Sequence, residues 1–294
     1  MCSVAIIGDI HDWHSEQIAF YLKKKGCEVI KLKYDELHAN FNSKKSFFFN
    51  CRLQNVDAVW LRFLNSGTLE EITTKLTFLH LLEEMNIYTH NSAKVIEKTV
   101  DKVRTTGLLE INKIPSPETM VWLGNSKNLE IRKNFLLKPI FGSQGKDILF
   151  LKQNTKLKNI TAKGNVFYLQ EFIGNPKEKE FSDIRVLVSN HKVIAAMKRS
   201  SKKFVTNIFQ GAKFEKVKLV NKLKNISEKV SKILNLGYGG IDIKIHKEKY
   251  FVLEVNSIPS WKTTQKIEKK NLSEILVNDF LKILRNKKRC LQKS

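Results

Sequence analysis

Residues 1–90 alternate between short apolar runs and amphipathic segments. Apolar or alternating runs predict strands at residues 4–9, 28–34, 56–63 and 87–89, and helical spacing of apolar side chains predicts helices at 15–25 and 69–85. A run as apolar as Val4-Ala5-Ile6-Ile7 is typical of a parallel strand that is buried on both faces. The rhythm therefore predicts a small doubly wound α/β domain over residues 1–90.

From residue 91 the pattern changes to mixed strands and hairpins. A helical segment at 92–110 is interrupted near residues 99–101 and is ended by Pro115. Further strands are predicted at 119–123, 134–140, 147–151, 166–173, 183–189, 193–198, 239–245 and 250–255, and helices at 218–234 and 273–284. This order predicts an antiparallel sheet with helices packed on one side, so the whole chain is expected to combine α/β and α+β parts.

Composition excludes some classes of protein and leaves others open. The chain has 294 residues and a formal net charge of +23, and apolar residues occur throughout, which excludes disorder. No stretch approaches the roughly 18–20 uninterrupted apolar residues that a membrane-spanning helix needs, and no signal peptide is evident. The charge favours anionic partners, but only eight of the 52 basic residues are arginine, the side chain that nucleic-acid readers favour.

The cysteines carry a weaker signal. Cys2, Cys27, Cys51 and Cys290 are widely scattered and form no CxxC pair. This spacing is typical of a reducing compartment in which thiols have no special role, so we expect the cytoplasm.

The strongest chemical signal is the set Asp242, Glu254 and Asn256 in two strands that flank a tight turn. With a three-residue turn, Asp242 lies opposite Glu254 and all three side chains share one face of the sheet, whereas a two-residue turn separates the two carboxylates. Together they would form a hard-oxygen site suited to Mg²⁺. The alternative is that Glu254 only pairs with Lys244 across the hairpin.

A second signal is Lys138, which lies in the apolar run FLLKPIF and is followed by the glycine loop Gly142-Ser143-Gln144-Gly145. An ammonium group in a run bound for burial needs an anionic partner, and glycines allow backbone N–H groups to approach phosphate closely. The segment does not match the P-loop pattern. A glycine loop alone is more often a simple turn.

These residues, in this order, resemble the ATP-grasp superfamily and, within it, the RimK-like alpha-L-glutamate ligases. Asp101-Lys102 is similar to the family's DK pair, and Lys138-Pro139 with GSQG resembles its phosphate lysine and flexible loop. The remaining matches are Val59–Arg62, Pro115–Thr119, Gln170–Ile173, Asp183-Ile184-Arg185, Met197-Lys198-Arg199, Asn207 with Gly211, Asp242, and the EVN signature at Glu254–Asn256. They extend over residues 4–284, and their number and order make the resemblance specific.

The resemblance implies a role for each matched residue. Nucleotide binding is implied for Lys102, Lys138, Gly142, Ser143, Gln144, Gly145, Gln170, Glu171, Phe172, Asp183 and Asn207. Arg185 and Arg199 would contact the substrate carboxylate or acyl phosphate, and Asp242, Glu254 and Asn256 would bind magnesium, with Mn²⁺ as an alternative metal. The implied domains are 1–90, a pre-ATP-grasp domain; 91–174, a linker helix and nucleotide lid; 175–284, a metal and substrate subdomain; and 285–294, a basic tail.

The implied activity is that of an ATP-dependent carboxylate–amine ligase that works through an acyl phosphate. The incoming amine would be glutamate or a similar amino acid, and the acceptor a protein C-terminus, a pterin cofactor or a small biosynthetic acid. Neither a membrane nor nucleic acid is required, and a homo-oligomer is left open. The chain departs from the family after EVN, where Ser257–Lys262 replaces a Ser-Pro-Gly turn. A similar Pro-x-Trp ending is found in ligases that add glutamate to tetrahydromethanopterin-like cofactors, which adds a pterin to the candidate acceptors.

Two other features of the sequence suggest competing functions. Asp9 and His11 resemble the opening motif of metallophosphoesterases, but the later motifs of that class are absent, so a sharp loop above the sheet is favoured. Phe47-Phe48-Phe49 beside Lys44 and Lys45, together with the basic tail, would suit a non-enzymatic nucleic-acid-binding protein. The presence of both the acidic set and the lysine pair Lys102 and Lys138 argues against this alternative.

Overall fold

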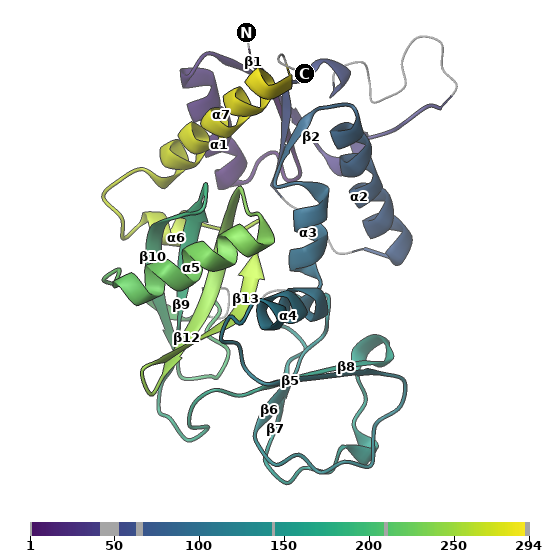
Figure 1. Ribbon diagram of the computed structural model, residues 1–294, viewed down its shortest axis with the longest axis vertical. Helices are drawn as coiled ribbons and strands as arrows, with labels where there is room; N and C mark the ends of the chain where they lie inside the picture. The colour runs from purple at the N-terminus through teal and green to yellow at the C-terminus, as the bar shows by residue number, and fades with distance from the viewer. Residues whose placement is uncertain (1, 42–52, 63–66, 143–144, 209–210, 292–294) are drawn as a thin grey trace.

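Three sheets follow one another along the long axis of the molecule (Figure 1). The structure is a computed structural model that describes residues 2–41, 53–62, 67–142, 145–208 and 211–291. The candidate nucleic-acid segment at 44–49 lies outside these residues. The two chain ends lie close together at one pole, beside the first sheet.

The first sheet is parallel, with strand order β2-β1-β3-β4. Its elements are β1 (Cys2–Ile7), α1 (Trp13–Lys24), β2 (Cys27–Leu32), β3 (Ala58–Leu61), α2 (Leu69–Glu84) and β4 (Tyr88–His90). A capping box fixes the start of α2, because Thr68 and Glu71 satisfy each other's backbone N–H groups. The predicted doubly wound α/β arrangement is present.

Both faces of this sheet are covered, which explains why its strands are apolar throughout. Val4, Ile6 and Trp60 pack against α1 and the last helix, α7 (Leu272–Leu291), whereas Ala5 and Ile7 pack against α2. Alternate residues of one strand thus enter two different cores. The helix α7 extends past its predicted end at Leu284, and it joins the C-terminal part of the chain to the first sheet.

A pair of helices leads from the first sheet to the other two. The helices α3 (Ala93–Val100) and α4 (Lys102–Ile111) are separated at Asp101, as the interruption near residues 99–101 predicted. Asp101 is extended, and its carboxylate accepts hydrogen bonds from Val103 N and Arg104 N at 2.8 and 3.1 Å. It therefore ends one helix and caps the next.

The second sheet forms a small antiparallel lid with strand order β5-β8-β6-β7. Its strands are β5 (Thr119–Leu123), β6 (Phe135–Leu137), β7 (Leu149–Leu151) and β8 (Val166–Glu171). Three of them are shorter than predicted, and β8 ends at Glu171 rather than at residue 173. Pro139 has no N–H to continue β6, and Asp147 has φ 58°, outside the extended region, so β7 begins only at Leu149.

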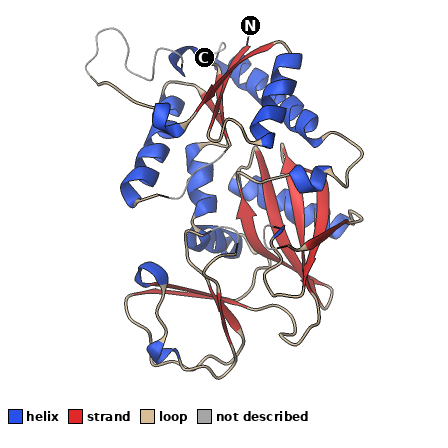
Figure 2. Ribbon diagram, turned by 180° about the vertical axis from the view of Figure 1, so that it is seen from behind, coloured by secondary structure: helices blue, strands red, loops and turns tan. Residues whose placement is uncertain are grey.

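The largest sheet is antiparallel, with order β11-β10-β9-β12-β13. It contains β9 (Phe181–Ser189), β10 (Lys192–Ser201), β11 (Lys213–Lys216), β12 (Tyr238–His246) and β13 (Lys249–Asn256), accompanied by α5 (Asn221–Leu234) and the short α6 (Lys262–Gln265). Apolar residues of the sheet such as Val186, Ile241 and Val255 pack with residues of α5. This helix covers one side of the sheet (Figure 2). The opposite face carries the polar side chains of Asp242, Glu254 and Asn256.

The hairpin β12–β13 reaches the expected register by an unexpected route. Its turn has two residues, Lys247 and Glu248, both with positive φ, which would separate Asp242 from Glu254. A β-bulge then adds one residue, Leu253, to β13, because the pairing passes from Ile243↔Val252 to Asp242↔Glu254. The carboxylates are opposite each other, although the turn has two residues and not the three that this register was expected to need.

In the part of the chain that the structure describes, no helix is both long enough and apolar enough to cross a bilayer.

Candidate active site

The predicted acidic residues meet on the face of the large sheet that is turned away from α5. Val255 lies in the core beneath, so Glu254 and Asn256, its neighbours in β13, project to the other side together with Asp242. Asp242 is buried, whereas the Glu254 side chain is 37% exposed. Lys244 donates to Ser182 O at 2.9 Å, so it does not make the cross-hairpin pair with Glu254 that was the alternative.

Two arginines converge on Asp242. Arg185 forms a bidentate pair with it, with Nε and Nη2 each 2.7 Å from a carboxylate oxygen, and Arg199 Nη2 lies 2.9 Å from Oδ2. Burial alone would raise the pKa of Asp242, but the two guanidinium groups hold it below its ordinary value. Asp242 is therefore an anion.

Asp183 completes this network at a deeper level. Its carboxylate accepts bidentate hydrogen bonds from Arg199 at 2.7 and 2.5 Å and one from Thr206 Oγ1 at 2.7 Å. Asp183 and the Arg199 side chain are both buried, whereas the Arg185 side chain is 17% exposed. Arg199 is thus held by two carboxylates, and Arg185 is the more accessible of the two cations.

The two predicted phosphate lysines lie above this face. Lys102 Nζ donates to Ile140 O and Gly142 O at 3.2 and 2.8 Å and lies 3.9 Å from Glu254 Oε1. Lys138 Nζ donates to Gln170 Oε1 at 2.6 Å, and burial lowers the pKa of this lysine to about 8, an effect that the charge of Glu254 opposes. Residues from α4, the lid and the large sheet are therefore brought together.

The glycine loop begins directly beside Lys102. Gly142 is the residue whose carbonyl Lys102 binds, and Gly145 has φ 69°, in the left-handed region that glycine adopts without strain. Ser143 and Gln144 lie outside the described residues. Within the described part, a loop with glycine at both ends adjoins the two lysines.

The predicted adenine segment divides into three different environments. Gln170 is buried and donates to Tyr168 Oη and Leu253 O, so the bulged residue of β13 contacts the lid. Glu171 instead pairs with Lys133 at 3.2 Å. Phe172 contacts the rings of Phe150 and Phe181. Asn207, the other predicted nucleotide-binding residue, lies outside this segment and follows β10.

Sequence reasoning missed the aromatic cluster between the lid and the large sheet. Phe172 packs edge-on against Phe150 and Phe181, with centroids 5.2 and 6.0 Å apart, and Phe150 is 5.8 Å from Phe204. Four rings from four separate segments therefore form one apolar cluster between the lid and the large sheet. No local sequence motif predicts this cluster, because the four rings come from separate parts of the sequence and meet only in the folded chain.

The side-chain oxygens on this face of the sheet fit a divalent metal. Asp242, Glu254 and Asn256 supply oxygen atoms only, which is the chemistry that Mg²⁺ requires. Among the described residues there is no group of three or more His, Cys, Asp and Glu side chains arranged for a metal ion, so such a site would depend on the Asn256 amide and on oxygens of a bound ligand.

Comparison with known proteins identifies this architecture. The RimK-like ATP-grasp domain family matches residues 99–280. The tetrahydromethanopterin:alpha-L-glutamate ligase of Methanococcus maripaludis is 29% identical over 288 residues, covering 95% of this chain and 97% of that protein. The alpha-aminoadipate–LysW ligase LysX of Sulfurisphaera tokodaii is 26% identical, with 93% and 96% covered. The solved ATP-grasp ligase PsnB, bound to a phosphomimetic precursor variant, Mg and ADP, shares the fold with a TM-score of 0.72 at 18% identity and 97% and 98% coverage.

The fold and the site thus define an ATP-grasp enzyme. The chain belongs to the RimK-like ATP-grasp family, and the predicted family and fold class are confirmed. The predicted enzyme class, an ATP-dependent ligase that forms an amide bond, is confirmed as well. A non-enzymatic nucleic-acid-binding protein is not supported.

Proposed function

We propose that this ligase joins glutamate to the carboxylate of a pterin-type acceptor and that the residues on the sheet face perform the reaction. The observation that carries the proposal is the convergence of Lys102, Lys138, Arg185, Asp242 and Glu254 from three parts of the fold. Support for the acceptor comes from the Pro259-x-Trp261 segment and from the full-length similarity to a tetrahydromethanopterin:alpha-L-glutamate ligase.

In the proposed reaction an oxygen of the acceptor carboxylate attacks the γ-phosphorus of ATP, and ADP leaves. The glutamate nitrogen then attacks the acyl carbon of the resulting acyl phosphate, inorganic phosphate leaves, and the nitrogen loses a proton. Lys102 and Lys138 would balance the phosphate charge while Gly142 and Gly145 allow close backbone approach. Arg185, the accessible arginine, would orient the acyl phosphate, and Arg199 would keep Asp242 and Asp183 in place.

The metal would be held by Asp242, Glu254 and Asn256, and Mn²⁺ would suit the same oxygen donors as Mg²⁺. When bound, it supplies positive charge that neutralises the transferring phosphoryl group. The aromatic cluster at Phe172 would pack against the adenine. The ranges 1–90, 91–174, 175–284 and 285–294 remain the proposed functional parts of the chain, and the cytoplasm is its proposed compartment.

The test is glutamate-dependent release of phosphate from ATP, measured with a pterin carboxylate, a peptide ending in glutamate and a small dicarboxylic acid as acceptors. We expect turnover with the pterin and a fall of at least about a hundredfold in kcat for Glu254→Gln, the order of loss typical of removing one charge-stabilising group. Glu110→Gln, which changes an exposed glutamate at the end of α4, is the matched control and should match the wild type. Turnover with the peptide alone would reassign the acceptor, and Glu254-independent turnover would contradict the site.

A further inference from the structure

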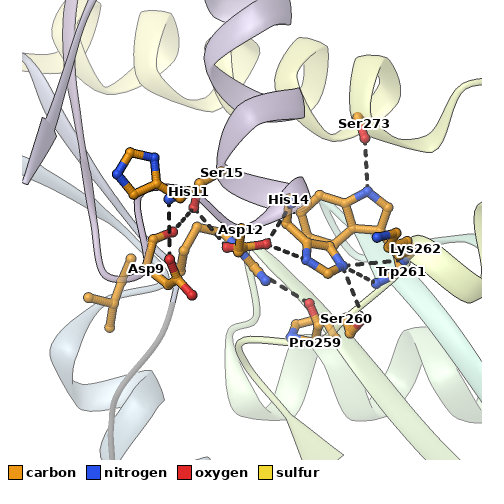
Figure 3. A network of polar contacts seen from close by, with 12 residues as sticks. Asp9, His11, Asp12, His14, Ser15, Pro259, Ser260, Trp261, Lys262 and Ser273 are labelled. Carbon is orange, nitrogen blue, oxygen red and sulfur yellow. Dashed lines mark hydrogen bonds and ion pairs between the residues drawn. The ribbon is translucent and has the colours of Figure 1, made fainter. Parts of the chain in front are cut away.

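The turn that follows the metal-binding strand is fixed to the first domain by a polar cluster that the proposed reaction does not use. This turn, residues 257–262, is the segment in which the chain departs from its family pattern. Figure 3 shows it meeting the loop before α1, with His14 between the two. The histidine comes from the first turn of α1 and is 246 residues away from Ser260 in sequence.

Three donors of the turn surround one nitrogen of His14. Nε2 lies 3.2 Å from Trp261 N, 3.3 Å from Lys262 N and 3.0 Å from Ser260 Oγ. A backbone N–H can only donate, so Nε2 has to be the unprotonated, accepting nitrogen. The hydrogen-bond network therefore assigns the proton of the neutral ring to Nδ1, which donates to Asp12 Oδ1 at 2.6 Å.

Asp12 is itself fixed. Its Oδ1 accepts from His14 N at 2.6 Å and its Oδ2 accepts from Ser15 Oγ at 2.9 Å, so it is the N-cap of α1. Burial opposes ionisation, but the hydrogen bonds from His14 and the charge of Arg62 hold the pKa of Asp12 below its ordinary range. The histidine thus has an anionic partner on one side and backbone donors on the other.

The turn is held from its far side as well. Trp261 is fully buried, donates from Nε1 to Ser273 Oγ at 2.9 Å, and carries the Arg62 guanidinium 4.8 Å from its ring centroid. Arg62 Nη1 also donates to Pro259 O at 3.2 Å. Since Asn256 immediately precedes this turn, the position of the turn and that of the last proposed metal ligand are linked.

We propose that His14 is a positioning residue that holds turn 257–262 in place only while its ring is neutral. A second ring proton would sit on Nε2 and face the N–H groups of Trp261 and Lys262, replacing two hydrogen bonds by repulsion. Burial of the ring opposes its protonation. Of the charged groups that face the ring, Asp12, the N-cap of α1, favours protonation, whereas Arg62, which follows β3, and Lys262, the first residue of α6, oppose it. Acidification would therefore weaken the attachment of the turn to the first domain, while the contacts of Arg62 and Trp261 remain.

The structural part can be measured without any substrate. In ¹⁵N-histidine-labelled full-length protein we expect His14 to show a protonated Nδ1 and a bare Nε2, and to titrate below the ordinary histidine value of about 6.5. The protection factors of the Trp261 and Lys262 amides against hydrogen exchange should fall at acid pH in the wild type and at all pH values in His14→Ala. A His14 protonated on Nε2, or unchanged exchange in His14→Ala, would overturn the proposal.

The kinetic part rests on the proposed function. We expect kcat/KM of His14→Ala to fall about tenfold at pH 7.5, since it loses two ordinary hydrogen bonds. His14→Gln, whose amide oxygen reaches the position of Nε2, should retain activity and lose the acid limb that the wild type shows. His246→Asn, on the distant hairpin, should leave the profile unchanged. An acid limb that persists in His14→Gln would contradict the inference, and absent turnover with the expected exchange result would contradict only the proposed function.

Discussion

At the scale of single residues, the two arginines of the site are paired with carboxylates, whereas the charge of Lys138 depends on pH. Arg199 is held between Asp183 and Asp242, and Arg185 is bound to Asp242 in a bidentate pair, so both guanidinium groups have carboxylate partners. Lys138 differs, because its one hydrogen-bond partner in the described structure is the neutral amide of Gln170 and burial opposes its charge. The phosphate-binding capacity of the site should therefore change with the protonation of this lysine.

We expect nucleotide affinity to fall as the pH rises above about 8, the pKa of Lys138. The charged ammonium is present below that pH and is lost above it, and only the charged form attracts phosphate. Titration of ADP by calorimetry between pH 6.5 and 9.5 measures this, with a loss on the order of tenfold expected. Lys138→Arg keeps its charge throughout and is the control; an equally steep fall in that variant would assign the effect to another group.

The residues of this site could be predicted individually, but not their division of labour. Asp242, Glu254 and Lys138 stand out because a charge in an apolar strand needs a partner. That Arg199 serves as support and Arg185 as the accessible cation depends on burial, which arises from packing against β9 and β10 and has no local signature.

At the scale of elements, apolar periodicity located most helices and strands, whereas irregularities escaped it. The bulge at Leu253 is the clearest case, since it lies in a run of four apolar residues, 250–253, in which no alternation shows where the register shifts. The turn is one residue shorter than this register needs, and the bulge adds one residue to β13. The two differences cancel, so Glu254 lies opposite Asp242. Register is a property of two paired strands, so neither strand alone reveals it.

The last helix makes a testable contribution to stability. Phe280 of α7 is 0% exposed, and its ring lies 4.9 Å from that of Trp60 and 5.2 Å from that of His90. We expect Phe280→Ala to lower the free energy of unfolding by about 3–5 kcal/mol, because a cavity would remain in the core beneath the first sheet.

Urea denaturation followed by circular dichroism measures this change. Phe20→Ala is the matched control, because Phe20 is 58% exposed on α1 and its loss should cost less than about 1 kcal/mol. Equal effects of the two substitutions would show that α7 does not contribute to the core of the first sheet in solution.

At the scale of the whole molecule, the junction between the first domain and the large sheet is a buried polar contact. Asn91 Nδ2 donates to Tyr238 O and Ser257 O at 2.8 and 2.7 Å, and its Oδ1 accepts from Gly237 N at 2.5 Å. Its neighbour His90 stacks on Tyr238, and a Cβ at Gly237 would lie 2.5 Å from the His90 ring. Three segments distant in sequence therefore meet around two adjacent side chains.

This junction makes stability depend on pH. Burial lowers the pKa of His90 to about 3, whereas the unfolded chain protonates this histidine near 6.5. The unfolded state binds more protons between these values, so the stabilisation is complete above pH 6.5 and is lost progressively as the pH falls toward 3. We expect the free energy of unfolding to decrease by several kcal/mol over this range.

Urea unfolding at pH 7 and pH 4.5 tests the expectation. His90→Phe keeps a ring in the stack and cannot bind the proton, so its stability should vary less between the two pH values. His38→Asn, at an exposed position, should behave as the wild type. If His90→Phe retained the full acid sensitivity, titrating groups other than His90 would be its source.

The contact of α7 with β1 and α1 also bears on the order in which the chain can fold during synthesis. Val4, Ile6 and Leu22 emerge from the ribosome more than 250 residues before Leu276 and Phe280, which help to cover them. All four strands of the first sheet are made by His90, but the part of its apolar face that packs against α7 stays open until that helix has been made. A ribosome that stops before α7 would release a chain with this face uncovered, which is the kind of surface that chaperones and proteases recognise.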